Sequence, residues 1–400
     1  MTDSLYKLFY SNPKAHNATY LERFNSPSSV HLPFHIKQFN HDKSFQAFFY
    51  YNQDLTLLLQ NIYTGFADFI HTLINVTPIV QRQFSLSCLV DEVLSTSSIE
   101  GIHSTHRELK DILDGNSNTT HFSSIIKKYD LLSSGQFTLF RSPNDIRAFY
   151  DEFAHDDIIA DNPNNKLDGL LFRNEAVDVR SASGKIIHRG ITPEQSIIDA
   201  LSHALDFLND ENFPMLVRIA AFHYLFAYIH PFYDGNGRTA RFISSAYIAK
   251  HLHPLIALRL AVTIKKNQKL YYSMLKETDA EINCGDLTPF ICGFMGFIAN
   301  TIHDINRKLK RKISQLERFR TIFAKIFHSN KFNSLIMDLL LQSSAFYGRG
   351  LSMNEIMSLT GKSRNTIKAK FPALPVRCIT ANTSRKNFYK IDWTKLKTLL

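Results

Sequence analysis

Apolar residues recur at spacings of three and four along much of this chain, the spacing typical of helices that bury one face. Strand-like alternation is confined to two places, residues 176–191 and residues 377–391. The pattern therefore predicts a mainly α fold with little β structure. The clearest helical stretches are 55–74, 197–208, 215–229 and 242–251.

The first strand-like segment has the form of a hairpin. The small residues of Ser181–Gly184 separate the run Ala176–Val179 from Ile186 and Ile187. Small residues of this kind suit the tight turn between two antiparallel strands. We expect a β-hairpin that is short and exposed enough to act as a flap.

The last quarter of the chain predicts a separate module. From Asn306 to Lys325, basic residues alternate with Leu, Ile and Phe, which favours a long helix. Three shorter helical stretches follow, with a turn at Gly361 before the third, and then the second strand-like segment. Helix, helix, tight turn, helix and strands is the order of a winged helix-turn-helix. The three stretches are 334–341, 352–359 and 362–370.

Composition indicates a folded protein of more than one domain, since 400 residues with 44% hydrophobic content exceed one ordinary core. The longest apolar stretch, 215–232, contains Arg218, His223 and His230, so we interpret it as a buried helix and not a membrane span. The N-terminus lacks the pattern of a secretory signal, which predicts a cytoplasmic location. Four scattered cysteines without CxxC spacing argue against a disulfide framework or a zinc site.

Positive charge is concentrated in the tail. The net charge is +10, but from residue 301 onward 20 Lys and Arg stand against 5 Asp and Glu, a net of +15, which leaves −5 for residues 1–300. A basic tail of this size suggests a nucleic-acid partner or an anionic surface. A solvated basic face is the alternative.

One segment combines several residues suited to phosphate chemistry. Pro231 and the glycines that follow it end the helix at Ile229, and the helical pattern resumes near Arg238, so a loop joins two helices. Backbone N–H groups just before a helix N-terminus favour an anion such as a phosphate, and glycine lets it approach closely. The N–H groups in question belong to Gly235, Asn236 and Gly237.

Charged side chains of the same loop suit chemistry at a phosphate group. Asp234 offers a hard oxygen ligand for Mg²⁺ shared with phosphates. Arg238 and Arg241, three residues apart, project to one side of the new helix. His230 is placed to remove a proton from a hydroxyl near neutral pH. We assign Phe232 to structure, as the residue that fixes the loop in the core.

The segment from His230 to Arg241 resembles the signature of the Fic (filamentation induced by cAMP) family, HPFx(D/E)GNGRxxR, with every specified position filled. The resemblance covers roughly residues 80 to 300. It implies an α-helical Fic fold and transfer of AMP from ATP to a Ser, Thr or Tyr hydroxyl of a protein, with release of pyrophosphate. Family members that transfer UMP or other phosphate-linked groups leave the donor open.

Carried over by position, the resemblance makes His230 the general base and Asp234 the Mg²⁺ ligand. Asn236 with its glycine neighbours becomes the anion hole, and the two arginines hold the β- and γ-phosphates. A related subgroup has Lys at the position of Gly237 and resembles kinases in outcome, so Gly237 favours AMP transfer. The ATP-binding positions are Gly235, Asn236, Gly237, Arg238 and Arg241.

The resemblance extends to the surroundings of the loop. The hairpin looks like the family's flap, whose edge would hold a target segment by main-chain pairing. Tyr271 and Tyr272, followed by residues 285–290, are similar to the helices that close the adenine pocket, although both tyrosines equally fit an ordinary core. The target-docking residues of the flap are Lys185, Ile186, Ile187 and His188.

An inhibitory element is suggested by the segment Thr96 to Gly101, which fits the family pattern (S/T)xxxE(G/N) on a predicted helix near 91–101. A spacing of four places Thr96 and Glu100 on one helix face, and Gly101 would permit close approach. The resemblance implies that Glu100 pairs with Arg241 and removes a partner of the γ-phosphate. The same glutamate could position water for de-AMPylation, and a surface carboxylate is the alternative.

The four parts expected are an N-terminal helical region (1–80), a Fic domain (81–305), a linking helix (306–325) and a winged helix-turn-helix (326–400). Exposed basic residues of the last part suit DNA, although such modules also dimerise or dock targets. A DNA-binding transcriptional regulator, or a toxin-antitoxin type regulator that retains a Fic body, is thus the alternative function. The DNA-facing candidates are Arg364, Asn365, Lys368, Arg385 and Lys386.

Overall fold

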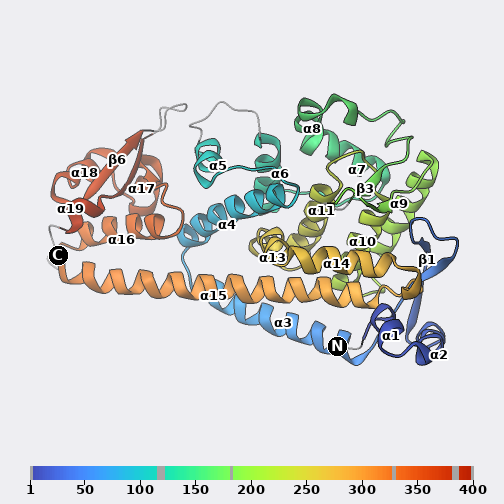
Figure 1. The fold of residues 1–400 in the computed structure, drawn as a ribbon. Helices are drawn as coiled ribbons and strands as arrows, with labels where there is room; N and C mark the ends of the chain where they lie inside the picture. The colour runs from blue at the N-terminus through green and yellow to red at the C-terminus, as the bar shows by residue number, and fades with distance from the viewer. Residues whose placement is uncertain (1–2, 115–121, 181–182, 327–329, 381–386, 398–400) are drawn as a thin grey trace. The chain divides into compact units, whose positions relative to one another are not determined.

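The computed structural model describes residues 3–114, 122–180, 183–326, 330–380 and 387–397. Helices dominate, and the strands are short, which confirms the mainly α prediction (Figure 1). The chain forms two compact units. The first comprises residues 1–66, 95–102 and 127–302, and the second comprises residues 67–94, 103–126 and 303–400.

Four helices contribute to both units, namely α3 (Gln53–Ile74), α4 (Pro78–Ile99), α6 (Ser123–Ser133) and α15 (Thr288–Ile326). The segment 306–325 is helical as part of α15. The remaining elements of the first unit are α1 (Leu5–Ser11), α2 (Pro13–Phe24), β1 (Ser29–Lys37), β2 (Ser44–Tyr50), α7 (Pro143–Tyr150), the π-helix η1 (Asp151–His155), α8 (Asp156–Asp161), the 3-10 turn η2 (Pro163–Asn165), β3 (Asp178–Arg180), β4 (Ile186–Arg189), α9 (Glu194–Asn209), α10 (Met215–Ile229), α11 (Asn236–His251), α12 (Pro254–Ala257), α13 (Leu260–Lys266), α14 (Gln268–Asp279) and the 3-10 turn η3 (Glu281–Asn283).

Helix α10 is the centre of the first unit. It is buried on all sides from Leu216 to Phe226, because its sequence is apolar all round and packs against α9 and α11. On α11, Phe242 joins an aromatic cluster in which its ring stacks on Phe149 of α7 at 4.6 Å. These helices fix the two ends of the loop at residues 230–235.

The N-terminal region contains a β-hairpin, and two expectations are therefore wrong: that residues 1–80 are helical throughout and that β structure is confined to two places. Strands β1 and β2 pair antiparallel. In β1, Leu32, Phe34 and Ile36 are buried while their neighbours face outward, which is the period of two that a half-buried strand requires. The prediction missed this strand because Pro33 lies within it, and proline is unfavourable inside a strand.

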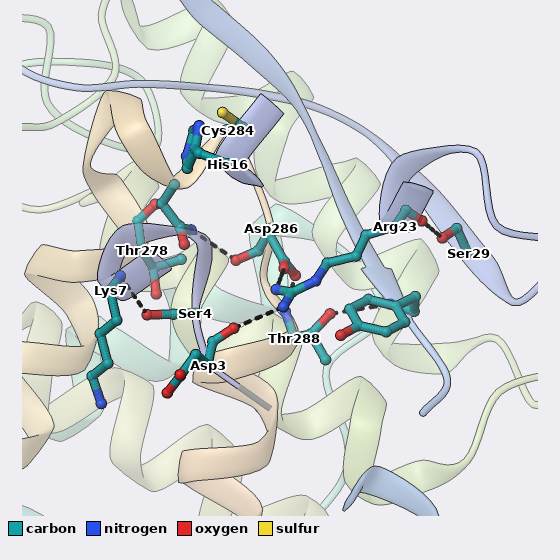
Figure 2. A network of polar contacts seen from close by, with 12 residues as sticks. Asp3, Ser4, Lys7, His16, Arg23, Ser29, Thr278, Cys284, Asp286 and Thr288 are labelled. Atoms are coloured by element: carbon teal, nitrogen blue, oxygen red, sulfur yellow. Dashed lines mark hydrogen bonds and ion pairs between the residues drawn. The ribbon is translucent and has the colours of Figure 1, made fainter. Parts of the chain in front are cut away.

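A buried ion pair holds the N-terminal helices on the rest of the first unit (Figure 2). Arg23 of α2 donates from Nη1 to Asp286 at 3.1 Å and from Nη2 to the carbonyl of Asp3 at 2.8 Å. Asp286 is fully buried and also accepts from the backbone N–H of Thr288 at 2.9 Å. Burial raises the pKa of Asp286, and these hydrogen bonds oppose that rise.

The second unit contains the helices and strands predicted for the C-terminal module, in the predicted order. Helix α17 begins with a capping box in which Ser352 and Glu355 satisfy each other's backbone N–H groups, and it ends at Gly361 with φ +64°. The strands form one sheet in the order β5-β7-β6. The elements are α5 (His106–Leu113), α16 (Lys331–Phe346), β5 (Leu351–Ser352), α17 (Met353–Thr360), α18 (Arg364–Lys368), the 3-10 turn η4 (Phe371–Ala373), β6 (Val376–Thr380), β7 (Asn387–Ile391) and α19 (Trp393–Lys397).

Within the described ranges, none of the helices combines the length and the apolar character needed to cross a membrane.

Candidate active site

The loop between α10 and α11 is fixed by its own side chains. Helix α10 ends at Ile229, and His230 takes a left-handed conformation with φ +54°. The Asn236 side chain closes the loop, since Oδ1 accepts from the Phe232 N–H at 2.9 Å and Nδ2 donates to the Phe232 carbonyl at 2.7 Å. The Phe232 ring is buried and stacks on Tyr150 at 3.7 Å. Asn236 thus organises the loop through its side-chain amide, which is occupied by the backbone of Phe232.

Arg173 supports the same loop and was missed by sequence reasoning. Its guanidinium is fully buried and donates to four backbone carbonyls, those of His230 at 2.9 Å, Glu175 at 2.6 Å, Ile191 at 2.9 Å and Ile229 at 3.4 Å. Burial lowers the pKa of Arg173 to about 10. A Cβ at Gly190 would overlap the guanidinium. Since its partners are main-chain oxygens, no residue pattern points to Arg173.

The imidazole of His230 is a neutral base. Its Nδ1 lies 3.2 Å from the carbonyl of Ala227, which can only accept, so Nδ1 carries the proton and Nε2 keeps its lone pair. Burial lowers the pKa of His230 to about 3, and the neighbouring His188 adds to this effect. The ring lines a cavity of about 180 Å³. His230 therefore presents an unprotonated nitrogen in that cavity at neutral pH.

The first turn of α11 lies beside His230 and offers backbone donors. The helix begins at Asn236 after Gly235 with φ +82°, and the first bond back to the loop comes from Thr239 to the Gly235 carbonyl. The N–H groups of Asn236, Gly237 and Arg238 therefore have no acceptor within the helix. Both Asn236 and Gly237 line the cavity. Unpaired donors and the positive end of the helix dipole together favour an anion here.

Asp234 and Arg238 lie on the same loop and turn. Asp234 accepts from the Gly235 N–H through Oδ1 at 2.5 Å, and its carbonyl accepts from the Tyr150 hydroxyl at 3.2 Å. Arg238 is buried, and its Nε has no hydrogen-bond partner among the described residues. Arg238 is not among the lining residues of the 180 Å³ cavity, whereas Arg241 is.

Glu100 lies inside the site, on Arg241. Oε1 of Glu100 is 2.6 Å from Nη2 of Arg241, and Thr96 accepts from the same guanidinium through Oγ1 at 2.9 Å and its carbonyl at 3.0 Å. Arg241 is fully buried, and the negative charge of Glu100 raises its pKa against the opposing effect of burial. The predicted ion pair is present, and Glu100 lies one residue beyond the end of α4.

The two glycines next to this pair have different roles. A Cβ at Gly237 would overlap Oε1 of Glu100, so the absence of a side chain there gives the carboxylate its place. At Gly101, by contrast, a Cβ would meet nothing within 4 Å. The expectation that Gly101 permits close approach is wrong. Gly101 is required for its φ of +80°, which ends the segment after α4.

The walls of the cavity come from α10, α14 and the flap. Tyr271 and Tyr272 both line it, Tyr271 buried and Tyr272 exposed. The Tyr271 hydroxyl meets Nε2 of His223 at 2.8 Å, and Nδ1 of His223 meets Ser244 at 2.9 Å. Residues 285–290 do not line the cavity, because Asp286 is bound to Arg23 and Gly285 lies against β2. Of the segments expected at an adenine pocket, only the two tyrosines line this cavity.

Strands β3 and β4 form the predicted hairpin, whose turn residues 181 and 182 lie outside the described residues. Ile187 and His188 of β4 line the cavity, whereas Lys185 and Ile186 lie beyond it.

His188 ties the flap to the helices. Its Nε2 lies 2.7 Å from the Tyr228 carbonyl and its Nδ1 lies 3.1 Å from Asp279, which also accepts from the Tyr224 hydroxyl. Both ring nitrogens face acceptors, so both carry protons. Although burial opposes it, Asp279 raises the pKa of His188.

Among the described residues, no three His, Cys, Asp or Glu side chains cluster as a ready metal site. A metal at this loop would therefore need oxygen ligands from its substrate in addition to Asp234.

Comparison with known proteins agrees with this geometry. The Fic/DOC family model matches residues 142–248. The chain is 33% identical over 104 residues to the protein adenylyltransferase fic-1 of Caenorhabditis elegans, which is 25% of this chain and 18% of that protein. It is 39% identical over 69 residues to the protein adenylyltransferase Fic of Nematostella vectensis, 17% of this chain and 14% of that protein. The chain thus spans less than a fifth of the length of these relatives.

A crystal structure of a Fic family protein from Desulfovibrio desulfuricans G20 has a similar fold, with a TM-score of 0.53 at 18% sequence identity. The similarity covers 86% of this chain and 97% of that one. The matched residues 142–248 contain the loop, Arg173, the flap and both arginines of α11. This part of the chain is therefore similar to the Fic/DOC family.

Proposed function

We propose that this chain transfers AMP from ATP to a hydroxyl group of a protein and that Glu100 restrains the reaction. The observation that carries the proposal is the shared cavity: His230, the first turn of α11 and Arg241 line it together. A base and a set of phosphate donors at one cavity are what nucleotide transfer requires. The relatives named as protein adenylyltransferases match this region.

The N–H groups of Asn236 and Gly237 would receive the α-phosphate. Arg241, once free of Glu100, would hold the terminal phosphates, and Arg238 would join it, since a buried guanidinium N–H without a partner is costly and implies a missing acceptor. Tyr271 and Tyr272 offer ring surface for the adenine.

Mg²⁺ fits the loop, because it binds proteins through one or two carboxylates and takes its remaining ligands from substrate phosphates and water. Asp234 is half-buried and uses one carboxylate oxygen for the Gly235 N–H, which leaves the other for a metal. When bound, Mg²⁺ would neutralise phosphate charge.

In the reaction, the oxygen of the target hydroxyl attacks the α-phosphorus, and the bond from phosphorus to the pyrophosphate oxygen breaks. The hydroxyl proton goes to Nε2 of His230, and pyrophosphate leaves. His230 is ready to accept, since its low pKa keeps the ring neutral, and an anionic nucleotide nearby raises that pKa toward a more effective base. Arg173 keeps the His230 backbone in place during the transfer.

Glu100 restrains transfer because it occupies the guanidinium that the terminal phosphates need and lies where Gly237 leaves room. A charge-assisted pair with a fully buried arginine is stronger than one at the surface. The same carboxylate lies in the cavity next to the phosphate site, where it could also orient water for removal of AMP from a modified target.

The test is mass spectrometry of a Glu100→Gly variant incubated with ATP, Mg²⁺ and cell lysate. We expect a mass gain of one AMP on protein side chains, more than with the wild type and none with Glu100→Gly/His230→Ala. A mass gain of UMP would indicate a different nucleotide donor, and a mass gain of phosphate would indicate a different reaction. No modification under any of these conditions would contradict the proposal.

A second proposed function is DNA binding by the C-terminal module, which has the order of a winged helix. Ser363 caps α18, Ile367 packs it into the module, and Arg364, Asn365 and Lys368 are exposed. Exposed cations on the third helix suit contacts with phosphates and base edges. The wing residues Arg385 and Lys386 lie outside the described residues.

Four free cysteines, three of them buried, are consistent with a reducing compartment, and we propose the cytoplasm.

A further inference from the structure

A groove of about 1,340 Å³ adjoins the cavity that contains His230, called here the nucleotide cavity. Its walls are the flap, helix α14, the segment 38–41 that follows β1, and α1. The groove and the nucleotide cavity share Ile187, Tyr272, Lys276 and Asp279 as lining residues. A molecule lying in the groove would therefore reach the cavity that contains His230.

The acidic side chains of the groove are already bound. Asp279 accepts from the Tyr224 hydroxyl at 2.7 Å and pairs with His188. Glu281 pairs with His41 at 2.7 Å and with Lys43 at 3.7 Å. The carboxylates of Asp279 and Glu281 thus have cationic partners nearby, and the groove is not an acidic surface.

Three lysines of the groove have no such partners. Lys185 on the flap and Lys269 and Lys276 on α14 are exposed, and none has an ion pair or hydrogen bond with another described residue. Lys269 and Lys276 lie two helical turns apart with Tyr272 between them, so all three share one face of α14. The groove thus has unpaired positive charge on two opposite elements and an aromatic ring between.

We propose that the groove binds the target protein through a segment rich in Asp and Glu that flanks the modified hydroxyl residue. Carboxylates of the segment pair with the three lysines, and its hydroxyl residue enters the cavity past Ile187. This assignment rests on the proposed AMP transfer. A peptide fits better than a nucleic acid because the proposed reaction needs a protein hydroxyl at His230 and because a strand edge of the flap borders the groove, which suits main-chain pairing.

The test measures binding first, without any chemistry. Fluorescence anisotropy compares three labelled peptides of equal length, each with one threonine flanked by glutamate, glutamine or lysine, on the full-length protein at several salt concentrations. We expect the glutamate peptide to bind about tenfold more tightly than the glutamine peptide at low salt and to lose this advantage as salt increases. Equal affinity for the three peptides would overturn the proposal.

Charge reversal identifies the surface. Lys185→Glu/Lys269→Glu should weaken the glutamate peptide about tenfold, since attraction becomes repulsion at two positions. Lys14→Glu/Lys166→Glu changes the net charge equally on exposed lysines outside the groove and should leave this affinity within about twofold. Thermal melting of both variants checks the fold. Equal losses in the two variants, or tighter binding of a single-stranded oligonucleotide at the groove lysines, would overturn the proposal.

Transfer is measured separately, with Glu100→Gly protein, ATP and Mg²⁺. AMP on the glutamate peptide in preference to the other two supports both proposals. Transfer to all three peptides at equal rates would refute the groove proposal and leave AMP transfer standing. Tight, lysine-dependent binding of the glutamate peptide without transfer of AMP to any peptide or protein would support the groove and contradict the proposed function.

Discussion

The loop at residues 230–235 leads into helix α11, and the turn at Gly361 leads into helix α18. Each helix has two cationic residues in its first two turns, yet these residues differ in burial. On α11, Arg241 is fully buried and bound by Glu100 and Thr96. On α18, Arg364 and Lys368 are exposed. A buried charge acts through one specified partner, whereas exposed charges act through a field that any anion can use. Single substitutions should therefore have large effects in the first region and small effects in the second.

The largest effect is expected at His230. His230→Ala removes the proton acceptor while the loop remains held by Asn236 and Phe232. We expect AMP transfer to fall by roughly two to four orders of magnitude, with ATP affinity nearly unchanged. Incorporation of labelled AMP and calorimetric titration with ATP measure the two quantities. Transfer at the wild-type rate would remove the catalytic role of His230.

The next effect tests the partner of Arg241. Glu100→Gly frees the guanidinium for the γ-phosphate, and we expect transfer to rise at least tenfold, roughly 1.4 kcal/mol in the barrier. Glu100→Gly/Arg241→Ala should lose this gain, because no partner for the phosphate remains. Both variants and the wild type are compared for AMP incorporation at equal protein and saturating ATP. If Glu100→Gly equals the wild type, the ion pair is structural only.

The pH dependence of stability tests burial in the first region. His223 and His230 have pKa values lowered to about 3, against about 6.5 in an unfolded chain. Between these values the unfolded state binds protons that the folded state does not, so the free energy of unfolding falls as pH falls, by up to about 1.4 kcal/mol per pH unit for each histidine.

Urea unfolding at pH 7, 6 and 5 measures this slope. His223→Gln should flatten it by the share of one histidine, whereas His203→Gln, at an exposed position of α9, should not. His188 has the opposite sign, because its pKa is raised and its stabilisation is lost as pH rises through that value. A slope unaffected by His223→Gln would mean that this ring is not kept neutral by burial.

The smallest effect is expected in the second region. Arg364→Ala/Lys368→Ala should weaken binding of the full-length protein to duplex DNA by about threefold on every sequence tested. It should also lower the salt slope by about two, one per phosphate contact. Filter binding over a range of salt concentrations gives both numbers. A loss confined to one DNA sequence would instead indicate contacts with base edges.

The sequence predicted the parts of the site that lie close together along the chain. Local spacing predicts the loop, the helix ends on either side of it, and the closeness of Thr96 to Glu100. The structure confirms these features. Arg173 and the pair of His188 with Asp279 could not be predicted, because they join distant segments through backbone carbonyls or a single carboxylate. The hairpin β1–β2 was missed although its alternation is regular, since Pro33 reads as a break.

Glu100 lies against Gly237, so the residue at position 237 and the pairing of Glu100 with Arg241 depend on each other. A comparison of sequences would treat these two positions as independent. A side chain at position 237 would overlap the carboxylate where it now lies, so Glu100 or the loop would have to shift. Under the proposed restraint by Glu100, a substitution at position 237 that changes how the donor is held would also disturb the pair of Glu100 with Arg241. We therefore expect the residues at positions 100 and 237 to change together.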